Sequence, residues 1–195
     1  MKQLPKLGGF TNWRALILEV VSIIVGVLIA LAMDEWNENR QNTNKAIKAV
    51  DNIKLELASN LRVLDIIHPG NKLSLETFQD EKIRNVDSLT ILPGLQLQET
   101  AWNTFLRTGV SAFIPYEDLY KIAELYNMIQ IYKEVGNRFI DTLTESRTLH
   151  SALGREIEDA AIIRENLSVL AMMVSIETNL MNFTKTYLES ESTTD

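Results

Sequence analysis

One stretch of the sequence, residues 15–33, limits what this chain can fold into. It contains a single charged side chain, Glu19, and no proline. At about 1.5 Å per residue, a helix from Trp13 to Trp36 would rise about 34 Å, and the hydrocarbon core of a bilayer is about 30 Å thick. Indole rings favour the membrane interface. The stretch therefore predicts a transmembrane helix with Trp13 and Trp36 as anchors at its two interfaces.

The charges that flank this span predict its orientation. Lys2, Lys6 and Arg14 precede it, and acidic residues follow it directly, beginning with Asp34 and Glu35. Positively charged flanks stay in the cytoplasm, so we expect a cytoplasmic N-terminus and a C-terminal domain on the outer side of the membrane. The predicted organisation is a cytoplasmic leader (1–14), a transmembrane helix (15–33), a helical bundle domain (34–189) and a flexible tail (190–195).

Two other interpretations of the apolar stretch remain open. A helix buried in a soluble core could be apolar, although it would usually be shorter or more polar on one face. A cleavable signal peptide is the second alternative, because Ala30-Leu31-Ala32 has the small-x-small form of a cleavage site. Against cleavage, Glu19 interrupts the apolar region, and no proline or glycine breaks the helical pattern after the site.

Glu19 lies on the same predicted helix face as a series of small residues. That face carries Glu19, Ser22, Gly26 and Ala30, and small residues four apart let a second helix approach closely. Intramembrane charges usually face protein, so we expect this face to pack against another helix, from a second copy or from a different membrane protein. Alternatively, Glu19 reaches the headgroups beside Arg14, or it relays protons.

The segment "ALILEVVSIIVGVLIALAMDEWNENR" resembles the opening of a family of bacterial single-pass membrane proteins with no assigned function. The matching features are Glu19, Gly26, Ala30, Trp36, Asn37 and Glu38. A looser similarity is found in "AWNTFLRTGV", through Trp102, Leu106 and Gly109. Asp34-Glu35 departs from the family, which more often has Asn or Gln there. The resemblance implies a membrane-anchored helical protein and no particular activity. With the orientation given above, we expect it at a bacterial inner membrane with its C-terminal domain in the periplasm.

Beyond the span, apolar residues recur at helical spacing, which predicts an all-α bundle. The first such helix continues from the span and should end at His68-Pro69-Gly70, with His68 near its C-terminus. Its predicted buried stripe is Ala46, Val50, Ile53, Leu57, Leu61, Leu64 and Ile67. A weaker helix is expected at 73–86, followed by a loop with a turn at Pro93-Gly94.

Three further helices are expected. A short one should cover Glu99 to Val110 and stop near Gly109, and Pro115 should open the next. A last helix should begin after Gly154 and reach Glu189. The expected stripe of the middle helix is Leu119, Ile122, Ala123, Tyr126, Ile129, Val135, Phe139 and Leu143. The expected stripe of the last is Ile157, Ala161, Leu167, Leu170, Val174, Leu180 and Phe183. "LSVLAMMVSI" is too short to span a membrane and should be core, with Met172 and Met173 filling gaps.

Composition excludes several kinds of chemistry. The chain has no cysteine and two histidines, so thiolate metal sites and thiol catalysis are ruled out. Its formal net charge of −7 argues against a nucleic-acid partner. No phosphate loop, nucleophile elbow or zinc motif is present, and we expect no catalytic, cofactor-binding or metal-binding residue. His150 with Glu156, Glu158 and Asp159 could share a face, but a solvated charged turn explains them better. A ligand pocket could be lined by aromatic residues, although core or rim positions are more common for them. The candidates are Trp102, Tyr116, Tyr120, Tyr126 and Tyr132.

These features favour a non-catalytic, membrane-anchored interaction or sensory module that self-associates through its transmembrane helix. The alternative is an accessory subunit of a membrane transport or energy-coupling complex, with Glu19 handling protons or an ion pair. An enzyme is not expected, and the predicted partners are the membrane and either a second copy or an unknown membrane protein.

Overall fold

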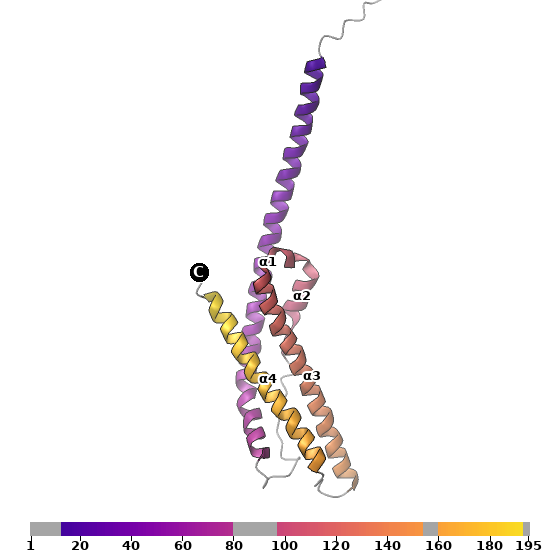
Figure 1. Ribbon diagram of the computed structural model, residues 1–195, viewed down its shortest axis with the longest axis vertical. Helices are drawn as coiled ribbons and strands as arrows, with labels where there is room; N and C mark the ends of the chain where they lie inside the picture. The colour runs from indigo at the N-terminus through magenta and orange to yellow at the C-terminus, as the bar shows by residue number, and fades with distance from the viewer. Residues whose placement is uncertain (1–12, 80–96, 154–159, 193–195) are drawn as a thin grey trace, which may run out of the picture. The chain divides into compact units, whose positions relative to one another are not determined.

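The computed structural model describes residues 13–79, 97–153 and 160–192, and these ranges contain helices and no strand (Figure 1). The predicted all-α fold is therefore confirmed. The elements are α1 (Trp13–Gln79), α2 (Thr100–Thr108), the 3₁₀ helix η2 (Val110–Phe113), α3 (Tyr116–Leu153) and α4 (Ala160–Ser192).

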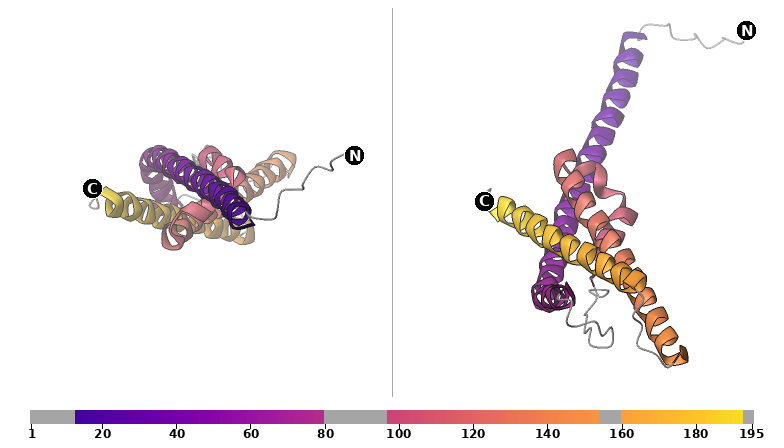
Figure 2. Two further views of the ribbon diagram at one scale, coloured as in Figure 1. Left: turned by 90° about the horizontal axis from the view of Figure 1, so that it is seen from above. Right: turned by 60° about the horizontal axis from the view of Figure 1, so that its bottom comes forward.

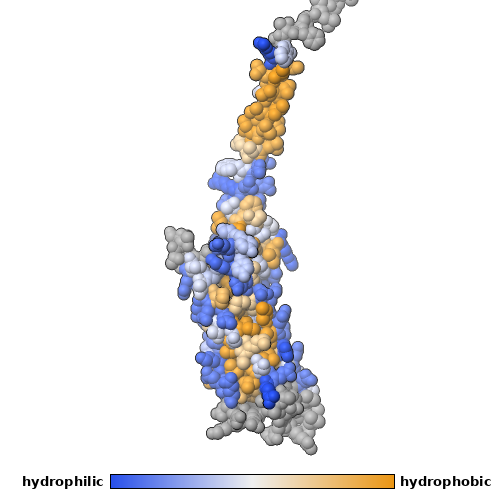
Figure 3. All heavy atoms as spheres, in the orientation of Figure 1, coloured by the Kyte–Doolittle hydropathy of each residue, from blue (hydrophilic) through white to orange (hydrophobic). Residues whose placement is uncertain are grey.

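The chain divides into two units, Met1–Lys45 and Ala46–Asp195. In the first unit, α1 from Trp13 onward is exposed along the whole apolar stretch. Figure 3 shows this stretch as a continuous hydrophobic surface, bounded by hydrophilic side chains. It is the one helix of the described residues that is long and apolar enough to cross a membrane, and none of its most apolar window is buried. The structure therefore does not support the alternative that this stretch is a helix buried in a soluble core.

In the second unit, α1 presents one face to the core. Ala46, Ile53, Leu57, Leu64 and Ile67 are buried, as the stripe predicts, and Val50 and Leu61 are half-buried. Three polar residues share that face and are absent from the predicted stripe: Glu56, Asn60 and Asn71. A helix period of about 3.6 residues places them there regardless of polarity.

The prediction that α1 ends at His68-Pro69-Gly70 is wrong. The helix continues through Pro69 to Gln79. Proline removes one backbone hydrogen bond and usually bends or breaks a helix, so its cost must be offset elsewhere. The residues beyond it supply that offset, because Asn71 and Phe78 are buried and so stabilise the last turns against the core. The start of the weaker helix expected at 73–86 is therefore the end of α1, and residues 80–96 lie outside the described residues.

Gly109 ends α2, as its sequence predicts. Its φ of 68° lies in the left-handed region, where a side chain is strained and glycine is not. The chain then makes the single 3₁₀ turn η2 and an extended residue, Ile114, before Pro115 precedes α3. The turn therefore reverses the chain within a few residues.

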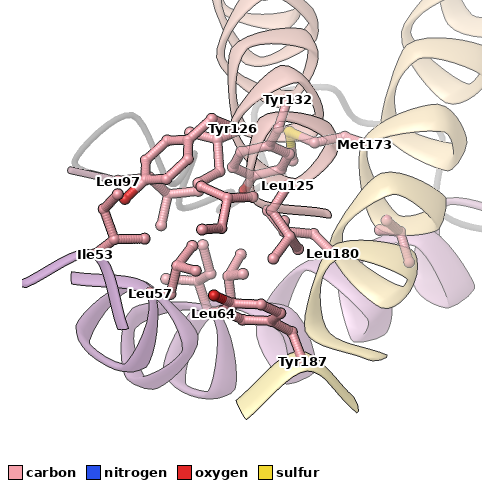
Figure 4. Close-up of a cluster of buried hydrophobic side chains, with 14 of the residues drawn as sticks. Ile53, Leu57, Leu64, Leu97, Leu125, Tyr126, Tyr132, Met173, Leu180 and Tyr187 are labelled. Atoms are coloured by element: carbon pink, nitrogen blue, oxygen red, sulfur yellow. The ribbon is translucent and has the colours of Figure 1, made fainter. Parts of the chain in front are cut away.

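Helices α3 and α4 pack against each other, and α4 lies across α1 and α3 (Figures 1 and 2). Side chains from all three helices meet in one core (Figure 4). The largest fully buried members include Tyr126, Tyr132, Phe105 and Phe139. The predicted boundary at Gly154 lies outside the described residues.

Two positions on α4 differ from expectation. Phe183 and Met172, both predicted to be core, are 50% and 52% exposed. The observed stripe passes through Glu177 and Thr184 instead, both buried. The prediction selected apolar residues in place of Glu177 and Thr184, and it therefore did not follow the period of about 3.6 residues per turn. Met173 is buried as predicted.

Candidate functional site

The residues predicted to anchor the span lie on the exposed first part of α1. Trp13 and Trp36 are 65% and 64% exposed. The guanidinium of Arg40 lies 5.8 Å from the ring centroid of Trp36, within the range of a cation–π contact. An indole next to a cation suits the boundary between hydrocarbon and water.

The predicted packing face is also exposed in the single chain. Glu19, Ser22, Gly26 and Ala30 are all accessible. A Cβ atom placed on Gly26 would meet nothing within 4 Å. The described part of the chain therefore leaves room for a second helix at this position, and the pairing stays a prediction.

The strongest polar constellation is centred on Glu177 in α4, which is fully buried. Its Oε1 accepts hydrogen bonds of 2.6 Å from Asn71 Nδ2 in α1 and of 2.6 Å from the hydroxyl of Tyr132 in α3. Its Oε2 lies 2.9 Å from Nδ1 of His68 in α1. One carboxylate thus holds three helices together.

This arrangement offsets the cost of burying a carboxylate. An unpaired buried charge is very unfavourable, whereas donors aimed at both oxygens compensate for lost water. The His68 ring keeps 18% of its side-chain surface exposed, so the cluster reaches the edge of the core. The expectation that His68 stands at a helix C-terminus is wrong, because α1 continues and its imidazole faces Glu177.

A second buried carboxylate, Glu56 of α1, holds α2 and α3. Its Oε1 accepts a 2.6 Å hydrogen bond from the Tyr126 hydroxyl, and its Oε2 accepts a 2.8 Å bond from the backbone N–H of Ala101. Burial raises the pKa of Tyr126, and the hydrogen bond and negative charge of Glu56 raise it further. The Tyr126 phenol therefore stays a donor to Glu56 well into the alkaline range.

The segment leading into α2 is fixed by paired contacts. The side chain of Asn60 donates to the carbonyl of Gln98 at 2.8 Å and accepts from its N–H at 2.7 Å. The next residue, Glu99, forms a 2.9 Å ion pair with Lys133 of α3. The ring of Trp102 stacks on Tyr126 with 5.2 Å between centroids. These contacts place the start of α2 on α1 and α3.

The Tyr126 contact gives a testable pH dependence. Tyr126→Phe should lower the free energy of unfolding by about 1–2 kcal/mol at neutral pH, because Glu56 loses a donor. In the wild type, the raised pKa keeps Tyr126 protonated when folded, while the unfolded chain releases its proton above pH about 10. Stability linked to Tyr126 is thus fully present below pH about 10 and lost as pH rises further.

Denaturation followed by circular dichroism between pH 7 and 11 checks this prediction. The alkaline loss of stability should be smaller in Tyr126→Phe than in the wild type. Tyr120→Phe is the matched control, since Tyr120 is 58% exposed and its removal should leave the alkaline loss unchanged. Equal alkaline loss in all three proteins would contradict the assignment.

Open grooves are present on the described part of the second unit. The first, of about 410 Å³, runs between α1 and α2, and the second, of about 400 Å³, lies between α3 and α4 beside the 3.3 Å pair of Arg138 and Glu165. The third, of about 210 Å³, includes Ile47 and Tyr187. Glu56 lines the first groove, but both its oxygens already accept hydrogen bonds. The residues that line these grooves therefore do not indicate a particular ligand.

The structure does not test the metal site considered for His150 and the acidic residues that follow it. Glu156, Glu158 and Asp159 lie outside the described residues, as does the side chain of His150. Within the described ranges, no group of three or more histidine or acidic residues could hold a metal ion. Of the candidate pocket aromatics, Tyr126 and Tyr132 are core, Trp102 is half-buried, and Tyr116 and Tyr120 are exposed.

Sequence reasoning missed both buried carboxylates, although a signal was present. Glu56 falls at the spacing of the α1 stripe, and Glu177 falls at that of α4. A carboxylate on an otherwise apolar face predicts a buried, bonded acid. Identifying its donors requires the tertiary structure, since His68 is 109 residues from Glu177.

The fold and these clusters define a helical bundle whose first helix is long and apolar enough to cross a membrane. Residues 19–94 match the model of a family of unknown function, DUF6090, and the match begins at Glu19 and covers the rest of α1. The sequence resemblance is thus confirmed as similarity to an uncharacterised domain. No curated protein and no solved structure matches the chain.

Proposed function

We propose that this protein is a non-catalytic, membrane-anchored helical module that binds a partner or senses a signal at a bacterial inner membrane. Its N-terminus lies in the cytoplasm, and its second unit lies in the periplasm. The observation that carries this proposal is the fully exposed apolar stretch of α1, next to a unit with a core of its own.

Several features support the anchoring part of the proposal. In water, an exposed apolar stretch of this length would be strongly unfavourable, whereas in a bilayer it is stable. The indoles of Trp13 and Trp36 stand at its two ends. The lysine and arginine residues before the span favour the proposed orientation.

The interaction role is supported by the chemistry of the second unit. Both oxygens of each buried carboxylate have a hydrogen-bond partner, which suits bracing of helices more than acid–base catalysis. Glu19, Ser22, Gly26 and Ala30 offer a face for helix pairing within the bilayer. A module of this kind catalyses no reaction and acts through the partner that it binds.

Cysteine labelling tests anchoring and orientation together, because the natural chain has no cysteine. Ser175→Cys places a thiol on an exposed position of α4, and Thr11→Cys places one in the leader. In intact spheroplasts, a membrane-impermeant maleimide should label the Ser175→Cys protein. It should label the Thr11→Cys protein only after lysis.

The same membranes are extracted with alkaline carbonate, and the protein's intact mass is measured. An integral protein should remain in the pellet with its first residues retained. Release by carbonate would contradict the anchor, and loss of the leader would indicate cleavage after Ala32. Reversed labelling would contradict the orientation alone.

A further inference from the structure

Besides Ile47, which is 56% exposed, three large apolar side chains stand exposed on α1 in the second unit. Leu55, Ile66 and Leu73 are 71%, 75% and 64% exposed. Exposed single leucines are common, but these three share one line of the helix. Eleven residues separate the first two and seven separate the last two, which correspond to about three and two turns.

This line faces away from the core. Each of the three residues stands two positions after a buried residue, and these buried residues are Ile53, Leu64 and Asn71. Two residues correspond to a rotation of about 200° around the helix, so the line is on the opposite side. The high exposure of all three side chains shows that no described element of the second unit covers the line.

Two residues of opposite charge lie on either side of this line. Lys48 and Asp51, both exposed, precede Leu55 on the same face. At about 100° per residue, they lie about 20° to one side of Leu55 and about 40° to the other. In two parallel helices related by a twofold axis, the side of one helix that carries Lys48 faces the side of the other helix that carries Asp51. Lys48 of each copy would then face Asp51 of the other.

We propose that the outward face of α1, formed by Leu55, Ile66 and Leu73, binds the same face of a second copy in a parallel dimer. This rests on the proposed membrane anchor, which gives all copies one orientation and confines them to a plane. Tethering raises the effective concentration, so a narrow face is sufficient. Arg62 shares the face, and its long side chain can turn its charge outward to water.

Disulfide crosslinking of single-cysteine variants in native membranes tests the dimer. In a parallel twofold pair, a thiol on the contact line meets its own copy, so Leu55→Cys, Ile66→Cys and Leu73→Cys should each form a covalent dimer on mild oxidation. Ser175→Cys on α4 is the matched exposed control and should give at least several-fold less. Equal crosslinking at residue 175, or none on the line, overturns the proposal.

Charge reversal tests the register within the Ile66→Cys background. Lys48→Asp and Asp51→Lys should each reduce the crosslinked fraction at least twofold, because each places like charges opposite one another. The double exchange should restore it. Reduction in the double variant as large as in the singles overturns the proposed pairing, provided that circular dichroism shows the helices intact.

Carbonate extraction and Ala30→Cys distinguish this inference from the anchor. Protein released by carbonate would contradict the proposed function itself. Protein that stays in the membrane and crosslinks at residue 30, but not at residues 55, 66 and 73, would leave the anchor standing and overturn only the dimer of the second unit.

Discussion

Replacing Glu177 with alanine is expected to lower the free energy of unfolding by about 3–5 kcal/mol. The side chain is fully buried, and its oxygens contact His68, Asn71 and Tyr132. Its removal leaves a cavity and takes an acceptor from three buried or half-buried donors at once. Denaturant titration of the detergent-solubilised protein, followed by circular dichroism, measures this loss.

Two variants separate the cluster from a general effect of losing an acid. Glu177→Gln keeps the shape and one acceptor oxygen, so it should cost less than alanine. Glu165→Ala removes an α4 carboxylate that is 53% exposed and pairs with Arg138, and solvated pairs contribute less than about 1 kcal/mol. An alanine at 177 that costs no more than one at 165 would show that the cluster does not hold the helices.

Removing residues 1–45 is expected to move the protein completely from the membrane to the soluble fraction while keeping it folded. Every buried residue of the described chain lies from Ala46 onward, and so do the contacts of Glu56 and Glu177. The deleted part contributes an apolar stretch and no core. Fractionation and a cooperative thermal transition of the 46–195 chain check both parts.

A version that begins at Trp36 serves as the control, because it retains the polar turns of the exposed helix and lacks the span. It should behave like the shorter chain. Aggregation of both would show that the first unit stabilises the second, contrary to the division between Lys45 and Ala46.

The sequence predicts the helices well where periodicity and turn chemistry agree. Gly109 and Pro115 mark the actual boundaries of α2 and α3, because glycine readily tolerates a φ of 68° and proline suits a helix start. Pro69 failed as a boundary because packing beyond it outweighed a local preference. Local rules cannot weigh contacts that form only after folding.

The candidate site was less predictable for the same reason. The helix face that carries Glu19 and Gly26 could be predicted from the sequence, because residues of one helix define it. The Glu177 cluster could not, because it joins α1, α3 and α4. In the sequence, Glu177 stands out only as the charge that ends an apolar run, whereas its position on the stripe is the informative feature.

The contacts of Glu177 also determine when its partners on α1 can be paired during synthesis of the chain. A ribosome adds about 5–20 residues per second, so His68 emerges roughly 5–20 s before its carboxylate partner, 109 residues later. Throughout that interval, the polar groups of α1 have no acceptor from α4. The contacts of Glu177 with α1 and α3 therefore form only after the final helix is synthesised, and translation that stops before Glu177 leaves them unmade.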